Sequence, residues 1–193
     1  MAPNFLKTAF RALSACGLSL TIQAAWADPS GFVYTANERD GSISEVHLDS
    51  SQVRTVKVNI TPHNVQVSPD GSTLLAVGVS AHSAHHGASS SGQLLLLNTA
   101  NLNAPPVAVP AGEHPAHVVT DATGERAFVS DSGANVVRVI NLKQRAEQAR
   151  IPTGDYPHGL RLSPDGRTLY VANMKGGTVS VIDVVTLQET QRI

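Results

Sequence analysis

The fold is decided by Pro157-His158-Gly159-Leu160, Ser163-Pro164-Asp165-Gly166, Tyr170-Val171-Ala172-Asn173 and Val179-Ser180-Val181-Ile182-Asp183. Ser-Pro-Asp-Gly is a turn sequence, because proline presets φ at the first central position and glycine accepts the positive φ that ends the turn. The two boxes that follow it are short, and the second is apolar at nearly every position, which is typical of a buried strand. This four-part phrase therefore predicts short antiparallel strands joined by tight turns.

The same phrase occurs earlier in the chain, in copies that open at Pro62 and Pro115 and in a half-copy that enters at Tyr34. Their matching boxes are Tyr34-Thr35-Ala36-Asn37, Ser68-Pro69-Asp70-Gly71, Leu75-Ala76-Val77-Gly78, Leu94-Leu95-Leu96-Leu97-Asn98, Asp121-Ala122-Thr123-Gly124, Phe128-Val129-Ser130-Asp131 and Val137-Arg138-Val139-Ile140-Asn141. A period of about 40 residues that contains several short strands indicates a solenoid or a propeller. An insertion of about ten residues near 80–91 explains the longer first interval.

Each copy is expected to supply four strands, the last of them a run such as 147–151. Four-stranded antiparallel meanders repeated around an axis form a β-propeller, an all-β fold. The chain holds three full copies, at about 62–112, 115–154 and 157–193, and three strands of another. We therefore predict an incomplete propeller of about four blades, whose open arc exposes apolar sheet faces.

The boxes resemble the YVTN-type β-propeller repeats, which also occur in the haem-binding propeller of cytochrome cd1 nitrite reductases and in lactonase-like propellers. The resemblance covers essentially all of residues 31–193. It is specific for the fold, and it implies little about activity, because the boxes are turn and core residues. Propellers of this kind usually close with about seven blades, so the length of this chain departs from the family pattern.

The first 27 residues are expected to be a secretory signal peptide. Lys7 and Arg11 form a positive region, residues 12–22 are apolar, and Ala25-Trp26-Ala27 is a cleavage site of the small-x-small type. A lipobox-like stretch ending at Cys16 offers an alternative, a lipoprotein, but only four residues separate Arg11 from Cys16. Cleavage after Ala27 predicts a periplasmic or secreted protein, with no membrane span and a single propeller domain at 28–193.

Composition excludes several kinds of partner. The net charge is −1, no cluster of Lys and Arg occurs, and aromatic residues make up 4% of the chain. These values argue against nucleic acid and against an acidic lipid surface as partners. Enzyme signatures are also missing, since the sequence has no Gly-x-Ser-x-Gly elbow and no His-Glu-x-x-His motif. A binding role without turnover is therefore expected.

Histidine placement is the strongest functional signal. Loops of a meander blade alternate between its two ends, so the loop before each copy and the loop between its second and third strands share one face. Seven of the eight histidines fall on or near that face, and His47 does not. The seven are His63, His82, His85, His86, His114, His117 and His158. His47 matches Asn and Asp residues at the end of a third strand and is expected to cap a turn.

Several converging imidazoles form a strong site for zinc, copper, nickel or iron. His63 and His158 occupy the same repeat position, so both are expected to approach the axis and to bind a cofactor or metal. His117 stands one position later, and the alternation of a strand predicts that it points away from the channel. His82, His85 and His86 lie in the inserted loop and are expected to cap the site.

Three functions remain open at this point. The first is an exported protein that binds a transition metal (copper, zinc or nickel) through the His-rich face, with His63, His82, His85, His86, His117 and His158 as candidate ligands. The second is an enzyme, for which the resemblance implies haem with a histidine axial ligand, or lactonase-like hydrolysis by groups that cannot be assigned. The third is a scaffold for another exported protein. Glu38, Asp40 and Asp131 are further candidates on the same face, as acid-base groups or hard ligands.

Overall fold

The computed structural model describes residues 30–81 and 91–193, which form four antiparallel sheets and one short 3-10 turn. The expected signal peptide, Cys16 and the loop histidines His82, His85 and His86 lie outside the described residues. Within the described ranges, no helix is both long enough and apolar enough to cross a membrane.

The first sheet has three strands, and the other three have four strands each. The first consists of β1 (Phe32–Asn37), β2 (Ser42–His47) and β3 (Val53–Lys57), with the 3-10 turn η1 (Glu38–Asp40) between β1 and β2. The second consists of β4 (Ile60–Val67), β5 (Thr73–Ser80), β6 (Gly92–Asn98) and β7 (Val107–Gly112). The third consists of β8 (Pro115–Thr120), β9 (Arg126–Asp131), β10 (Val136–Asn141) and β11 (Ala146–Pro152). The fourth consists of β12 (Pro157–Leu162), β13 (Thr168–Asn173), β14 (Thr178–Asp183) and β15 (Gln188–Arg192).

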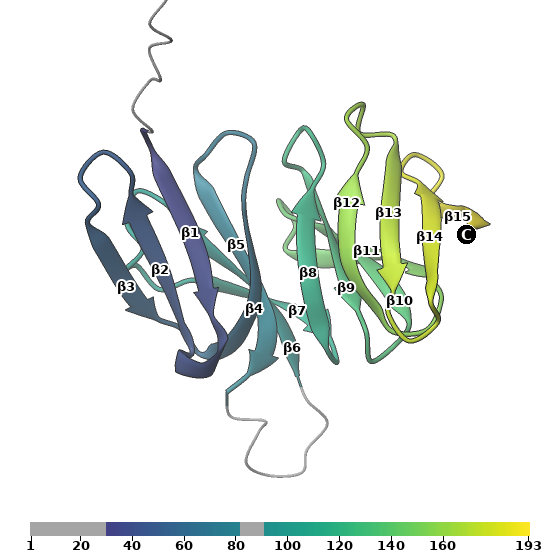
Figure 1. The fold of residues 1–193 in the computed structure, drawn as a ribbon, viewed down its shortest axis with the longest axis horizontal. Coiled ribbons are helices and arrows are strands. Elements are labelled where there is room, and N and C mark those ends of the chain that lie inside the picture. The colour runs from purple at the N-terminus through teal and green to yellow at the C-terminus, as the bar shows by residue number, and fades with distance from the viewer. Residues whose placement is uncertain (1–29, 82–90) are drawn as a thin grey trace, which may run out of the picture.

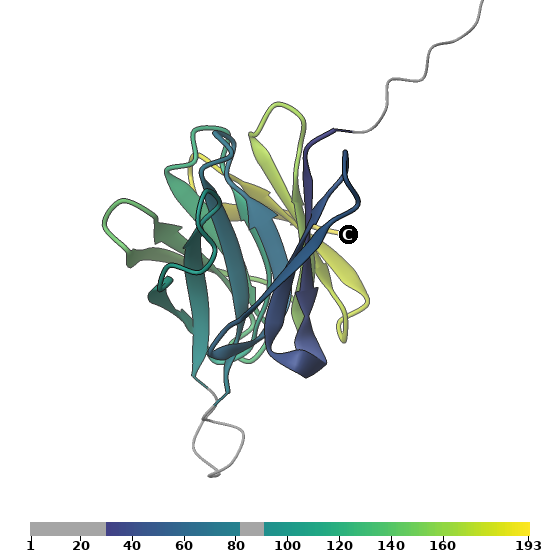
Figure 2. The same cartoon turned by 90° about the vertical axis from the view of Figure 1, so that its left-hand side faces the viewer.

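The sheets are the blades of a β-propeller arc, as the repeat predicts. Strands pair with their neighbours in chain order within each sheet, which is the order of a meander. The first strands of the sheets, β1, β4, β8 and β12, contact one another in that order. They lie along the middle of the molecule, and the remaining strands of each sheet extend outward from them (Figures 1 and 2). The prediction of three full blades and three strands of another is confirmed.

The core lies between the blades, and the second strands of the two middle blades, β5 and β9, each serve two interfaces. On β9, Phe128 packs toward the last blade, whereas its neighbour Val129 packs toward the blade of β4–β7. On β5, Leu74 and Leu75 are divided in the same way between the first and third blades. Side chains of a strand alternate between its faces, so a strand covered on both faces is apolar at consecutive positions. This explains the continuous apolar boxes.

The turns between the first and second strands form as predicted. Gly71, Gly124 and Gly166 each have φ of about +70°, and each donates its N–H to the carbonyl three residues earlier, at 2.9 to 3.1 Å. In the first of these turns the hydroxyl of Ser68 donates to the Asp70 carboxylate at 2.6 Å and accepts from the N–H of Thr73 at 3.0 Å. The turns thus set the register in which β4, β8 and β12 pair with β5, β9 and β13.

The last blade presents one uncovered face. On β13, Leu169 and Val171 are fully buried, whereas Tyr170 between them is 45% exposed. The equivalent positions on β9 are buried on both faces. Among residues 30–81 and 91–193, no further sheet packs against this face of β12–β15, which explains the alternation and agrees with the expected exposure of apolar residues in an open arc.

Candidate metal centre on the inner strands

The site is built on the inner strands, which are the first strands β4, β8 and β12 of three blades. Each of them has a β-bulge directly after its opening proline. The register shifts lie between Pro62 and Asn64, between Pro115 and Val118, and between Pro157 and Leu160. A bulge places an extra residue opposite the partner strand, which interrupts the strict alternation of side chains. Adjacent positions after the proline can therefore face the same side.

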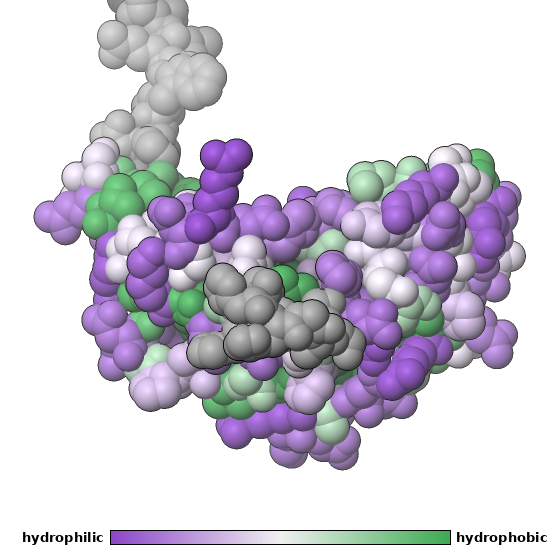
Figure 3. Space-filling view, turned by 90° about the horizontal axis from the view of Figure 1, so that it is seen from below, coloured by the Kyte–Doolittle hydropathy of each residue, from purple (hydrophilic) through white to green (hydrophobic). Residues whose placement is uncertain are grey.

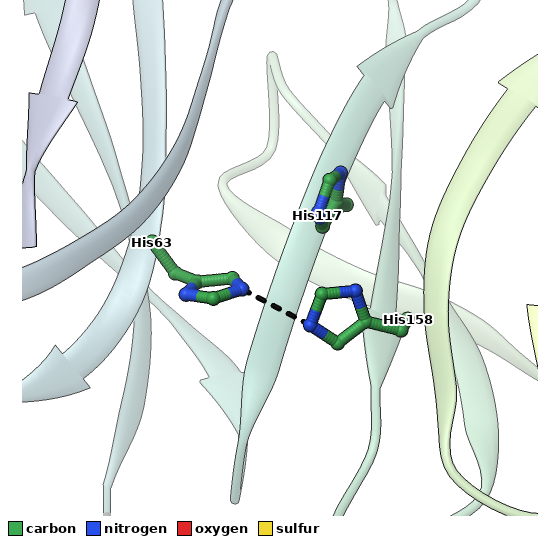
Figure 4. Close-up of side chains that lie close together, drawn as sticks. All are labelled: His63, His117 and His158. Atoms are coloured by element: carbon green, nitrogen blue, oxygen red, sulfur yellow. Dashed lines mark hydrogen bonds between the residues drawn. The ribbon is translucent and has the colours of Figure 1, made fainter. Parts of the chain in front are cut away.

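Three histidines meet at these bulges. His63 on β4, His117 on β8 and His158 on β12 each offer a ring nitrogen, and these three nitrogens lie within 4.8 Å of one another. The Nε2 atoms of His63 and His158 are 3.1 Å apart, and the ring centroids of the three pairs are separated by 4.9 to 5.7 Å. Figure 4 shows the rings of His63 and His158 pointing toward each other, with His117 beside them.

The structure contradicts one expectation from the sequence. Strand alternation predicts that His117 points away from the channel, yet its ring contacts both of the other histidine rings. The alternation rule fails here because the bulge of β8 adds a residue between Pro115 and Val118. The site therefore has three histidines, one from each of three consecutive blades.

A buried serine ties two of these histidines together through their backbones. Ser130 on β9 is fully buried; its hydroxyl donates to the carbonyl of His158 at 2.6 Å and accepts from the N–H of His117 at 3.0 Å. On the other side, the side-chain oxygen of Asn64 accepts from the N–H of Val118 at 3.1 Å. These bonds link β4 to β8 directly and β8 to β12 through Ser130 on β9, so the spacing of the three imidazoles is set by the packing of the blades.

Burial keeps two of the imidazoles neutral. It lowers the pKa of His117 to about 4, and the nearby charges of His158, His63 and Arg161 act in the same direction. Burial also lowers the pKa of His158, with a further contribution from His63. A neutral imidazole has a free lone pair, which is the form that binds a metal ion. His117 and His158 are thus in the form that binds a metal ion at neutral pH.

Geometry allows a metal ion with small adjustments. Two imidazole nitrogens bound to one tetrahedral zinc ion lie about 3.3 Å apart, given Zn–N distances near 2.0 to 2.1 Å. The His63–His158 separation of 3.1 Å is already close to that value. The widest separation in the cluster must shorten by about 1.5 Å, which is within the reach of a side-chain rotation.

Carboxylates near the site have different roles. Glu38 on η1 places its Oε1 atom 3.4 Å from Nδ1 of His63. Asp131, a candidate acid-base group by sequence, is instead fully buried; it pairs with Arg138 and accepts from the N–H groups of Glu113 and His114. Asp40 accepts a bond from Lys57 through its backbone oxygen. Of these three carboxylates, only Glu38 contacts a histidine of the cluster.

A small pocket adjoins His63 and His158. Its volume is about 160 Å³, and its polar lining includes Glu38, His114, Ser132 and Tyr156. Pockets for drug-sized organic ligands begin at about 300 Å³. The described residues therefore do not fit a haem macrocycle at this position. The volume suits water or a ligand of a few atoms beside a metal ion.

Two further histidines among the described residues, His114 and His47, are not part of the cluster. His114 lines the pocket from the loop before β8. His47 is the last residue of β2, with its Nδ1 atom 3.7 Å from Asp49 and its ring packed edge-on against Phe32. Sequence reasoning missed the roles of Ser130 and Asn64, since a single serine or asparagine in a strand carries no signal of its own.

Comparisons with known proteins agree with this architecture. Residues 95–193 match the model of a family described as YNCE-like β-propellers. A curated relative, antigen Lp49 of Leptospira interrogans serogroup Icterohaemorrhagiae serovar copenhageni (strain Fiocruz L1-130), is 39% identical over 56 residues, which are 29% of this chain and 12% of that protein.

Two solved structures share the fold. Hydrazine synthase from Kuenenia stuttgartiensis has a TM-score of 0.71 at 22% identity, over 83% of this chain and 45% of that one. A nidogen/laminin complex has a TM-score of 0.69 at 14% identity, over 84% of this chain and 59% of that one. The chain spans less than two thirds of the length of each of these three relatives, and the two structural matches show a common fold alone. The predicted YVTN-type β-propeller is confirmed.

Proposed function

The chain belongs to the YNCE-like β-propeller family, and we propose that in this member the inner strands bind a divalent transition-metal ion through His63, His117 and His158. The observation that carries the proposal is the convergence of three ring nitrogens within 4.8 Å. A propeller needs no such cluster to fold, because its core consists of apolar residues between the blades.

The donor set favours particular metals. Imidazole nitrogens suit zinc, copper and nickel, whereas calcium and magnesium prefer oxygen ligands. Three histidines leave at least one coordination position for water or for a small ligand, and the pocket of about 160 Å³ adjoins two of the three rings. We therefore expect Zn²⁺ or Cu²⁺ to bind more tightly than Mg²⁺, in a role of binding without turnover.

Calorimetric titration of the metal-free protein with ZnCl₂ and CuCl₂ tests the proposal. The double variant His63→Ala/His158→Ala should lose tight binding, while His47→Ala should retain it, because His47 lies outside the cluster. A third variant, with His82, His85 and His86 all changed to Ala, separates the cluster from the loop and should still bind one ion. Circular dichroism verifies that each variant is folded. An unchanged titration in the double variant would contradict the proposal.

Export belongs to the same proposal. The signal expected at 1–27 would deliver a propeller at 28–193 to the periplasm or the exterior. N-terminal sequencing of protein recovered from that compartment should begin at Asp28. Recovery from the cytoplasm with Met1 intact, or as a lipid-linked chain beginning at Cys16, would refute cleavage after Ala27.

A further inference from the structure

The first blade provides none of the three histidines of the cluster, but it reaches the site through one carboxylate. Glu38 lies on η1, directly after β1, and η1 contacts β4, the strand that carries His63. The Glu38 Oε1 atom is 3.4 Å from Nδ1 of His63, and the glutamate side chain is 58% exposed against 33% for the imidazole. This end of the molecule is largely hydrophilic where it is described, with small apolar patches (Figure 3).

The contact favours one of the two nitrogens of His63 as the position of the proton. A neutral imidazole has one N–H and one lone pair, and an ionised carboxylate only accepts hydrogen bonds. With Glu38 as the acceptor, the proton of His63 lies on Nδ1 and its Nε2 lone pair faces the interior of the cluster. Nε2 of His158, 3.1 Å away, must then carry the N–H of the bond between the two rings. On that assignment the two histidines are opposite tautomers in the metal-free protein.

We propose that Glu38 is a positioning residue of the metal centre, which holds His63 as a ready Nε2 ligand; this inference rests on the proposed metal-binding function. A metal-bound histidine commonly donates its other N–H to a carboxylate, which fixes the ring and strengthens the lone pair. When the ion binds, His63 keeps its proton on Nδ1. His158 gives its Nε2 proton to solvent and takes one from solvent on Nδ1, so that both rings remain neutral.

The size of the effect follows from known outer-shell carboxylates, whose removal usually weakens metal binding by about 10- to 100-fold. Glu38→Ala should weaken Zn²⁺ binding within that range, because His63 then divides between two tautomers and rotates more freely. Glu38→Gln should give a smaller loss, since its amide oxygen still accepts from Nδ1 without the charge. Asp40→Ala on the same turn is the matched control and should leave the affinity unchanged.

Nitrogen NMR of the full chain with ¹⁵N-labelled histidine gives an independent measurement. Long-range ¹H–¹⁵N correlations should show His63 as the Nδ1–H tautomer and His158 as the Nε2–H tautomer without metal. Zn²⁺ should convert His158 to Nδ1–H and leave His63 as it was. Glu38→Ala should mix the tautomers of His63, and Glu38→Gln should largely preserve them.

The possible failures are distinguishable. An Nε2–H tautomer of His63 in the metal-free wild type, or an unchanged Zn²⁺ affinity in Glu38→Ala, would overturn the role of Glu38 while leaving the metal site intact. A wild-type protein that binds no Zn²⁺ or Cu²⁺ would instead overturn the proposed function, and with it the metal-positioning role. In that case the NMR spectrum still decides whether Glu38 sets the tautomer.

Discussion

The Nε2 atoms of His63 and His158 lie 3.1 Å apart, although 95 positions separate the two residues in the chain. Between them, β8 adds His117 from the intervening blade. A ligand bound at this point therefore connects three blades that otherwise hold together through apolar packing and a few polar bonds.

Metal binding should stabilise the fold. A ligand that binds only the native state adds RT ln(1 + [L]/Kd), which is about 2.7 kcal/mol at a free concentration one hundred times Kd. Thermal unfolding in the presence of ZnCl₂ should shift upward by several degrees, and EDTA should reverse the shift. The measurement should use the variant without His82, His85 and His86, so that binding to the loop does not contribute. Adding His158→Ala to that variant should abolish the shift in unfolding temperature. An equal shift with and without His158→Ala would show that the stabilisation does not come from metal bound at the cluster.

Acid should destabilise the metal-free protein through His117. The pKa of this imidazole is about 6.5 when exposed and about 4 in the fold, so the unfolded chain binds a proton first as the pH falls. The stabilising contribution is therefore complete above pH 6.5 and is lost progressively between pH 6.5 and pH 4. Allowing for partial exposure, the loss should amount to about 2 kcal/mol.

Urea unfolding between pH 4 and 8 measures that dependence. His117→Asn should flatten it in part, because the lowered pKa of His158 contributes in the same direction and remains. His47→Asn is the control and should keep the wild-type slope, since His47 lies outside the cluster. A His117→Asn variant with the full wild-type slope would show that the imidazole is not buried as described.

Ser130 should matter for both stability and affinity. Its hydroxyl bonds His117 and His158, and removing it leaves buried backbone groups without a partner, which costs about 1 to 3 kcal/mol each. Ser130→Ala should therefore lower the urea midpoint and weaken Zn²⁺ binding. Ser180→Ala is the matched control, because this equally buried serine bonds Asn173 and Gly154 instead. It should lower stability while leaving the Zn²⁺ affinity unchanged.

Asp131 and Arg138 should behave as a single unit. At the same repeat positions, Asn37 donates to Ser44 at 2.8 Å and Asn173 donates to Ser180 at 2.9 Å. Asp131→Asn alone leaves the cation of Arg138 without its buried partner, and breaking such a pair costs about 3 to 5 kcal/mol. The double variant Asp131→Asn/Arg138→Ser rebuilds the neutral pair of the first and last blades.

Urea denaturation of the two single variants and the double variant forms a thermodynamic cycle. The double variant should lose less free energy of unfolding than the sum of the two single variants. Glu147, which also pairs with Arg138, becomes solvated in the double variant because its side chain is 27% exposed. Strict additivity would mean that the two positions do not interact.

Much of the fold could be predicted because its signals are local. The Ser68-Pro69-Asp70-Gly71 turn depends on the backbone preferences of proline and glycine, and the structure shows the expected positive φ at Gly71. The apolar box at 94–98 predicts a strand covered on both faces, which is what the packing of β6 between two blades requires. Repetition of these signals was enough to predict a propeller arc and to place His63 and His158 at equivalent positions.

The composition of the site was decided only by contacts between strands that are distant in the chain. His117 joins the cluster because a bulge on β8 interrupts the alternation from which its direction was predicted. Ser130 bridges two blades, and Glu38 reaches His63 from a third. Such relationships depend on the register between strands and on the distance between blades. A sequence pattern records which residues repeat, whereas the packing of the blades determines which of them touch.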